Sequence, residues 1–236
     1  MKILTFIIAV VLILNISCQR ILFNEQEEMR EIKLNAFHAV TFSGIYNIIL
    51  VQDSTNKLIM KGRNHIGSID ALIMNDTLMV DDHKKMSFNT NKNNLELHFK
   101  NLNFIRTYDP VSISGSDTIR TDRLSIETLG EIAEVKMNLR CNSLDVATSA
   151  NTLGYQHYYG KTDFCYFFSR YGSSFFADSL ICRSAIVYNE SIGDVRINVS
   201  DYLQVFIWGN GNIYYKGSPV IDYSEKRGKG QVIRLN

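Results

Sequence analysis

The distribution of apolar residues from Leu124 to Gly217 repeats about every 20 residues. Each repeat opens with a short run in which bulky or apolar residues occupy the first and third positions, the alternation typical of a strand buried on one face. A second strand-like run lies between successive starts. The first runs begin at Leu124, Leu144, Phe164, Ala185 and Leu203, so their starts are spaced by 20, 20, 21 and 18 residues.

A period of this length with two short strands per unit predicts a solenoid with one coil per repeat. No unit of this size can bury its apolar face alone, so each coil needs neighbours stacked on it. We therefore predict an all-β protein built on a right-handed β-helix-like solenoid of about five coils of about 20 residues. An antiparallel sandwich, which also has short strands at regular spacing, stays open as the alternative.

The first half of the chain has strand-like runs without this register. A glycine turn at residues 43–44 separates two of them, and Asn75-Asp76 marks the turn of a hairpin. The end of a solenoid exposes unpaired backbone N–H and C=O groups of its last strands. We therefore expect this half of the chain to form a sheet that covers one end of the solenoid. The expected divisions are an N-terminal β region at 32–110, solenoid coils at 111–221 and a C-terminal strand and tail at 222–236.

The N-terminus has the pattern of an export signal. Two residues, one of them Lys2, precede an almost unbroken apolar run of 12 residues from Ile3 to Leu14. That run is too short to span a membrane as a helix and suits a signal peptide. It ends just before Cys18, which follows a small residue as in a bacterial lipobox. We expect a signal peptide at 1–17 and a lipidated Cys18 opening a tether at 18–31, which would anchor the protein to the outer membrane.

Composition limits the class of partner. The chain has 236 residues and a formal net charge of +1, so it lacks the basic excess expected of a nucleic-acid-binding protein. Three cysteines follow Cys18, at positions 141, 165 and 182. Cys141 and Cys182 occupy equivalent positions two coils apart, about 10 Å at about 4.8 Å per layer, which is too far for a disulfide. We expect buried free thiols.

No catalytic, cofactor or metal motif is present in the sequence. It lacks a P-loop, an HExxH, a CxxC and a GxSxG pattern. The triplet Asp81-Asp82-His83 reads as a solvated turn rather than a metal site. Solenoid lyases and glycosidases use acidic and basic residues spread over a sheet face, so an enzyme stays open as an alternative. The charged candidates on the early coils are Glu127, Glu134, Lys136 and Asp145.

Aromatic residues are concentrated in the middle of the repeats, where 10 of the 22 residues from Tyr155 to Phe176 are aromatic. Aligning Phe164 with Leu144 places Phe164, Tyr166 and Phe168 inside the solenoid. Phe167 then faces outward. The expected outward ladder of rings, a candidate contact surface for a glycan or a protein ligand, consists of Phe167, Tyr188, Phe206 and Trp208.

Two glycine-punctuated segments resemble a known family. The first is Phe37-x-x-Val40-x-Phe-Ser-Gly44-x-Tyr46-x-Ile48-x-Leu50, and the second is Gly209-Asn-Gly-Asn-Ile-Tyr-Tyr-Lys-Gly-Ser-Pro219, followed by Gly228-Lys-Gly. Together they resemble the head GIN domain family of auto-transporter adhesin heads, over residues 32–236. From the residues themselves, we expect the glycines at 209 and 211 to allow positive φ angles in a tight corner between two strands.

The resemblance implies a β-helix-like fold and an adhesive role, with no catalytic residue to carry over. Together with the N-terminal signal it predicts a non-enzymatic, lipid-anchored envelope protein, on the periplasmic face or the cell surface. Its solenoid surface would serve as a binding module. A carbohydrate-active enzyme and a ligand-free envelope scaffold are the alternatives, and the oligomeric state is left open.

Overall fold

The computed structural model describes residues 27–63, 66–83 and 93–235. The described residues are almost entirely β, with one 3-10 turn, η1 (Ile66–Ser68), and no α-helix. None of the described segments forms a helix that is long and apolar enough to cross a membrane. Cys18 and the signal peptide predicted at 1–17 lie outside the described residues.

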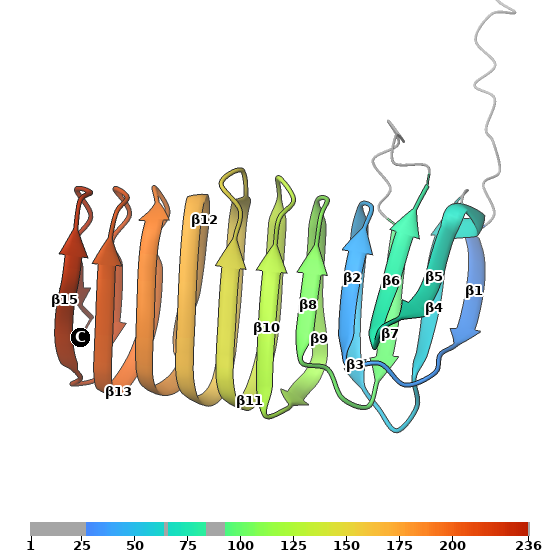
Figure 1. Ribbon diagram of the computed structural model, residues 1–236, viewed down its shortest axis with the longest axis horizontal. Helices are drawn as coiled ribbons and strands as arrows, with labels where there is room; N and C mark the ends of the chain where they lie inside the picture. Colours follow the sequence, from blue (N-terminus) through green and yellow to red (C-terminus); the bar gives the residue numbers. More distant parts are fainter. Residues whose placement is uncertain (1–26, 64–65, 84–92, 236) are drawn as a thin grey trace, which may run out of the picture.

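The chain winds into a flattened solenoid whose two facing sheets we name front and back after the view in Figure 1. Each coil adds one strand to each sheet, and successive strands of a sheet pair in parallel. Three long strands bend from the back sheet into the front sheet: β11 (Ala133–Thr148), β12 (Leu153–Ser191), which runs through two coils, and β13 (Val195–Ile207). This parallel stacking confirms the predicted all-β solenoid.

The remaining strands divide between the two sheets. The front sheet contains β5 (Ile69–Met74), β6 (Thr77–Asp82), β2 (Ala39–Ser43), β8 (Phe104–Thr107), β10 (Arg123–Thr128) and β15 (Val220–Lys226). The back sheet contains β1 (Glu27–Lys33), β4 (Lys57–Arg63), β7 (Asn93–Phe99), β3 (Tyr46–Gln52), β9 (Val111–Arg120), β14 (Ile213–Lys216) and β16 (Val232–Arg234).

Parallel coiling begins in the N-terminal half, because β2 pairs with β8 and β3 pairs with β9 in parallel. Antiparallel strands complete this end: β1 and β4 extend the back sheet, and the β5–β6 hairpin extends the front sheet. The predicted hairpin turn is confirmed. Asn75 and Asp76 have φ angles of 49° and 64°, the left-handed conformations that two-residue hairpin turns require.

The core lies between the two sheets and consists of side chains stacked in rows along the solenoid axis. One front-sheet row is apolar and fully buried throughout, and burial stabilises each such side chain by roughly 1.5–3 kcal/mol. The row consists of Val40, Ile105, Ile126, Val146, Phe167, Val187 and Val205.

The position of Phe167 in this row corrects the alignment made from sequence. Leu144 pairs with Cys165 and not with Phe164, so this coil is 21 residues long where its predecessor is 20. Phe167 is therefore buried at 0% exposure, while Phe164, Tyr166 and Phe168 lie half-buried on the outer side. A shift of one residue exchanges the two faces of a strand, and that exchange explains the error.

A second interior row is polar and lies beneath the turns at the upper edge of Figure 1. Several of its hydroxyl and amide groups hydrogen-bond to backbone groups of the turns. Ser173 Oγ donates to Thr152 O at 2.9 Å, and Asn189 Nδ2 donates to the carbonyls of Gly193 and Gly211 at 3.1 and 3.0 Å. The buried members at the strand ends are Thr107, Thr128, Thr148, Ser169 and Asn189.

The glycines at 209 and 211 serve close packing rather than the positive φ angles expected from the sequence. Neither residue has a positive φ. A Cβ at Gly209 would collide with the carbonyl of Ser191, and one at Gly211 would collide with that of Gly193. The absence of a side chain lets each turn approach the turn of the preceding coil.

The three cysteines of the described chain are free and buried, as predicted. Burial raises the pKa of the Cys141 and Cys165 thiols. Cys141 contacts Thr162 Oγ1 at 3.5 Å, and Cys182 Sγ donates to Ser184 O at 2.8 Å. The thiols therefore pack as small apolar groups near the lower corner of the solenoid.

Candidate functional site

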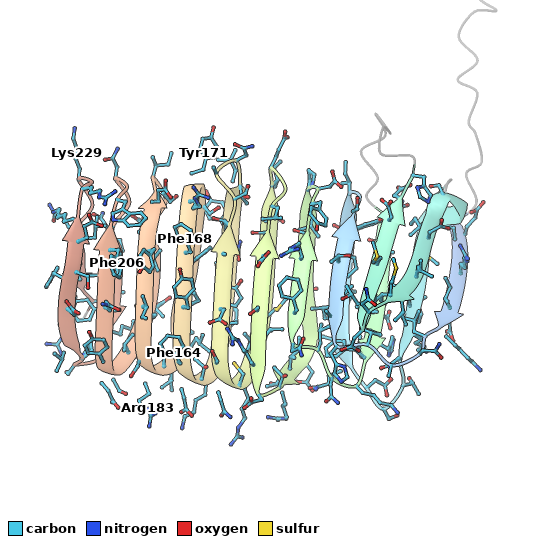
Figure 2. All side chains as sticks on the ribbon, in the orientation of Figure 1. Phe164, Phe168, Tyr171, Arg183, Phe206 and Lys229 are labelled. Carbon is cyan, nitrogen blue, oxygen red and sulfur yellow. The ribbon has the colours of Figure 1, made fainter. Side chains whose placement is uncertain are left out.

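Aromatic rings gather on the outer side of the front sheet, over the coils formed by β12 and β13. We call this group the front aromatic surface, and Figure 2 shows three of its members, Phe164, Phe168 and Phe206, projecting from the ribbon. All six of its rings are half-buried on the outer face. Its members are Phe164, Tyr166, Phe168, Tyr188, Phe206 and Trp208.

The rings of this surface contact one another across coils. Tyr188 and Phe206 are paired in the sheet register and stack with centroids 4.0 Å apart and planes 5° apart. Tyr188 also meets Tyr166 at 5.7 Å and Phe168 at 5.8 Å, and Trp208 packs edge-on at 5.4 Å. Such contacts hold the rings in one arrangement before any ligand arrives, which lowers the entropic cost of binding.

Two arginine–glutamate pairs border the rings. The guanidinium of Arg170 lies 5.2 Å from the Phe168 centroid and bonds Glu190 at 3.0 Å. Arg227 lies 5.1 Å from the Trp208 centroid and bonds Glu225 at 2.6 Å, and Trp208 Nε1 donates to the same glutamate at 2.8 Å. The surface therefore combines apolar faces with a polar border, the composition of many recognition sites.

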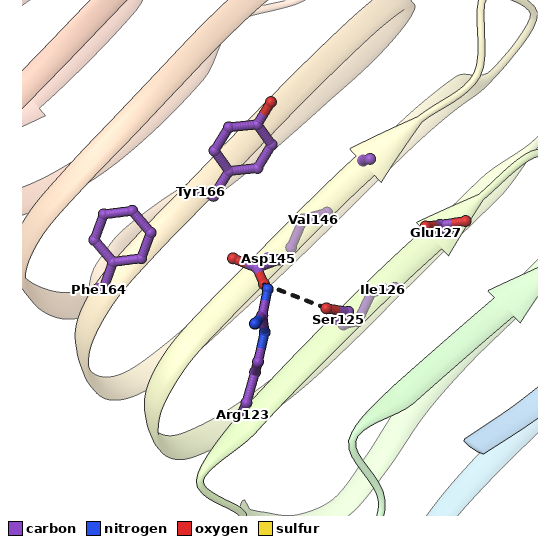
Figure 3. A pocket seen from close by; sticks show the side chains of 9 residues that line it. Arg123, Ser125, Ile126, Glu127, Asp145, Val146, Phe164 and Tyr166 are labelled. Carbon is purple, nitrogen blue, oxygen red and sulfur yellow. Dashed lines mark hydrogen bonds and ion pairs between the residues drawn. The ribbon is translucent and has the colours of Figure 1, made fainter. Parts of the chain in front are cut away.

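A groove of about 450 Å³ opens where the rings give way to smaller side chains on β10 and β11. Phe164 and Tyr166 form one wall and, as Figure 3 shows, present their ring faces to the opening. Arg123, Ser125 and Asp145 form the polar wall opposite them. Aromatic rings beside hydroxyl, carboxylate and guanidinium groups can hold a ligand with one apolar face and several hydroxyls.

The two carboxylates of the groove are already engaged. Arg123 Nε and Nη2 both donate to Asp145 Oδ2, at 2.8 and 2.5 Å, and Ser125 Oγ donates to the same oxygen at 3.3 Å. Glu127 accepts a bond from Arg106 Nε at 2.7 Å. Each arginine links neighbouring coils and orients a carboxylate that still has acceptor capacity for a ligand hydroxyl.

The residues chosen from sequence as a contact surface lie partly on the outer face and partly in the core. Tyr188, Phe206 and Trp208 lie together on the outer face, whereas Phe167 belongs to the core, and Phe168 stands where the sequence placed Phe167. The remaining acidic and basic candidates are divided between the sheets. Asp145 and Glu127 line this groove, but Glu134 and Lys136 lie on the back sheet.

No group of three or more metal-ligating side chains with suitable geometry occurs within residues 27–63, 66–83 and 93–235. In the Asp81-Asp82-His83 segment, His83 instead bonds Asp70 at 2.8 Å. That hydrogen bond raises the pKa of His83. The segment closes the β5–β6 hairpin through a surface ion pair.

A family described as "Putative auto-transporter adhesin, head GIN domain" matches residues 36–219 of the sequence. The chain belongs to the head GIN domain family. A comparison with curated proteins gave no match. Because the family match spans β2 to the turn before β15, both the groove and the front aromatic surface lie within the head GIN domain.

Solved structures share the fold over nearly their whole length. A "putative adhesin" from Bacteroides fragilis NCTC 9343 is 21% identical with a TM-score of 0.81, covering 89% of this chain and 98% of its own. A "putative adhesin" from Parabacteroides distasonis ATCC 8503 is 15% identical with a TM-score of 0.67, covering 90% and 98%. A "putative lipid binding protein" from the same strain is 18% identical with a TM-score of 0.66, also covering 90% and 98%.

Proposed function

We propose that this head GIN domain is a non-enzymatic binding module of the cell envelope that holds a glycan on its front aromatic surface and groove. The observation that carries the proposal is the pair Phe164 and Tyr166, whose ring faces look out of the groove beside the polar groups of Arg123, Ser125 and Asp145. Sugar rings have one face of C–H groups, which packs on aromatic rings, and a rim of hydroxyls, which bonds carboxylates and guanidinium groups.

The adhesin names given to the family and to its solved relatives support this proposal. The rings that continue from Tyr166 through Tyr188 to Phe206 extend the same contact over three coils, so an extended glycan is favoured over a single sugar. A protein ligand with an exposed apolar strip would use the same rings, and the experiment below separates the two.

A hydrolytic enzyme is less well supported by the groove. Glycoside hydrolysis needs one carboxyl group to donate a proton and another to act as base or nucleophile. Here Glu127 and Asp145 each accept bonds from an arginine, at 2.7 and 2.8 Å. That arrangement suits fixed acceptors for ligand hydroxyls better than a proton donor.

A glycan array probed with the purified protein tests the proposal, followed by affinity measurements on the best glycan. We expect Tyr166→Ala and Tyr188→Ala to weaken binding by about tenfold each, the usual effect of removing a central aromatic contact. Tyr171→Ala is the matched control, because Tyr171 is exposed at the upper edge of Figure 2 and lines neither groove. The glycan site would be refuted if all three variants lost affinity equally, or if the protein bound no glycan on the array. If the protein bound no glycan but did bind a defined protein ligand, the rings would be assigned to protein binding.

We further propose that the module is tethered to the outer membrane by lipid on Cys18. The support is the 12-residue apolar run from Ile3 to Leu14, which ends just before this cysteine. Cells fed labelled palmitate should label the wild-type protein and not Cys18→Ala. Equal labelling of the two proteins would contradict the anchor without affecting the glycan proposal.

A further inference from the structure

The outer side of the back sheet carries a row of stacked side chains on the face opposite the front aromatic surface. The row runs along the solenoid axis through five successive coils. His157 and Phe176 stack with centroids 4.7 Å apart and planes 12° apart. The sheet register pairs Lys136 with His157, Phe176 with Arg196 and Arg196 with Tyr214, so the row reads Lys136, His157, Phe176, Arg196 and Tyr214.

Arg196 is held between two rings in this row. Its guanidinium carbon lies 5.5 Å from the Phe176 centroid and 5.4 Å from the Tyr214 centroid. A guanidinium is planar and weakly hydrated, so rings on both sides fix its orientation without neutralising it. The side chain is therefore organised for binding before a partner is present.

Arg196 differs from the other ring-stacked arginines by lacking a carboxylate. On the front sheet, each guanidinium that packs on a ring also binds an acidic side chain. In the described part of the chain Arg196 has no ion pair and no side-chain hydrogen bond, and its Nε is buried without a partner. The front-sheet pairs are Arg106 with Glu127 beside Phe104, Arg170 with Glu190 beside Phe168, and Arg227 with Glu225 beside Trp208.

The acidic residues on neighbouring positions of the back sheet already have other partners. Asp194 accepts a bond from the backbone N–H of Asn212 at 2.8 Å. Asp178 binds Lys216 Nζ at 2.9 Å. The carboxylate that would complete the Arg196 site is thus not supplied by the described residues around it.

The other end of the row opens into a groove of about 390 Å³. Lys136, His157 and Tyr155 line it together with the hydroxyls of Ser112 and Ser114 and the carboxylate of Glu134. Lys136 lies three coils from Arg196, which corresponds to about 14 Å at about 4.8 Å per coil. Two cations at this spacing, with rings between them and hydroxyls at one end, match a linear ligand that carries repeated carboxylates.

We propose that this row is a binding site for an acidic polysaccharide laid along the solenoid axis. Arg196 receives one carboxylate through the two terminal nitrogens of its guanidinium, Lys136 attracts a second, and C–H groups of the sugars contact the outer edges of the stacked His157 and Phe176 rings. The proposal goes beyond the front-surface function, since it concerns the opposite sheet and a charged ligand. The two proposals fail independently.

Binding of polygalacturonate to the purified protein, measured at low and high salt, tests the site. We expect measurable binding at low salt that weakens as salt screens the ion pairs, and no binding of neutral dextran. Arg196→Gln should weaken polygalacturonate binding about tenfold or more, and Arg196→Lys should recover only part of it, because lysine keeps the charge but loses the fork.

Three controls make the outcome decisive. Arg183→Gln removes the same charge from an exposed corner and should leave affinity within about twofold. Lys136→Gln, at an exposed position, should weaken binding about threefold, and it keeps the test available if Arg196→Gln does not fold. Tyr188→Ala should bind normally. The proposal is overturned if polygalacturonate does not bind, if Arg183→Gln is as weak as Arg196→Gln, or if polyglutamate binds equally well.

Discussion

Replacing Asn189 by alanine should destabilise the solenoid without altering its surface. The Asn189 side chain is fully buried and makes three well-formed hydrogen bonds. Its Nδ2 donates to Gly193 O at 3.1 Å and Gly211 O at 3.0 Å, and its Oδ1 accepts from the Ser191 N–H at 3.1 Å. These bonds join two neighbouring turns, so the substitution leaves backbone groups of both without a partner.

The magnitude follows from the number of bonds. Each buried hydrogen bond contributes about 0.5–1.5 kcal/mol net, so three give a loss of about 1.5–4.5 kcal/mol. At a urea m-value of about 3 kcal/mol per molar, the unfolding midpoint should fall by about 0.5–1.5 M. Water entering the vacated space would replace some bonds and move the result toward the lower value.

Urea titration followed by circular dichroism measures this shift. Asn138→Ala is the matched control, since Asn138 lies on a strand but points to solvent, and its free energy of unfolding should stay within about 0.5 kcal/mol of wild type. If Asn189→Ala unfolded at the same urea concentration as Asn138→Ala, the interior polar row would not stabilise the turns and our account of it would be wrong.

Three further predictions concern the core. Phe167→Ala should cost about 3–5 kcal/mol in urea unfolding, whereas Phe168→Ala, on the outer face, should cost about 1 kcal/mol; similar losses would contradict the register. Burial raises the pKa of Tyr158 and Tyr46, so both phenols should stay protonated at about pH 11 in an ultraviolet titration. Tyrosines of the unfolded chain ionise near pH 10, so the contribution of these two side chains to the free energy of unfolding is fully present below that pH and is lost as the pH rises further. In Tyr158→Phe the free energy of unfolding should therefore fall less steeply with pH. Cys141, Cys165 and Cys182 should be unreactive in the native protein and titrate as three free thiols after unfolding without reductant; a count of one would reveal a disulfide.

The solenoid could be predicted from sequence because period-2 alternation within a 20-residue repeat survives in most coils. The prediction of which residues face the core failed at Phe164-Cys-Tyr-Phe-Phe168. All five positions are apolar, so no alternation shows which of them point inward. The polar corner residues would have resolved it. Asn142 and Asp163 occupy the same corner in successive coils, and aligning them gives the observed 21-residue spacing.

The candidate sites depended on neighbours that no local pattern reveals. The Arg123–Asp145 pair and the Arg196 sandwich join residues 18 to 22 positions apart, each on a different coil. Their contacts follow only once the length of every coil is known. The sequence shows that aromatic residues are abundant here, but the register decides which of them reach the surface.

Parallel coils stacked along one axis also determine how this protein would respond to a pulling force. The backbone hydrogen bonds between coils run along that axis, so tension between the two ends loads them in series, one coil after another. Each coil that opens releases about 20 residues, or about 60–70 Å of extended chain. A ligand held at the middle of the solenoid therefore loads only the coils between itself and the point of attachment, and the remaining coils stay folded.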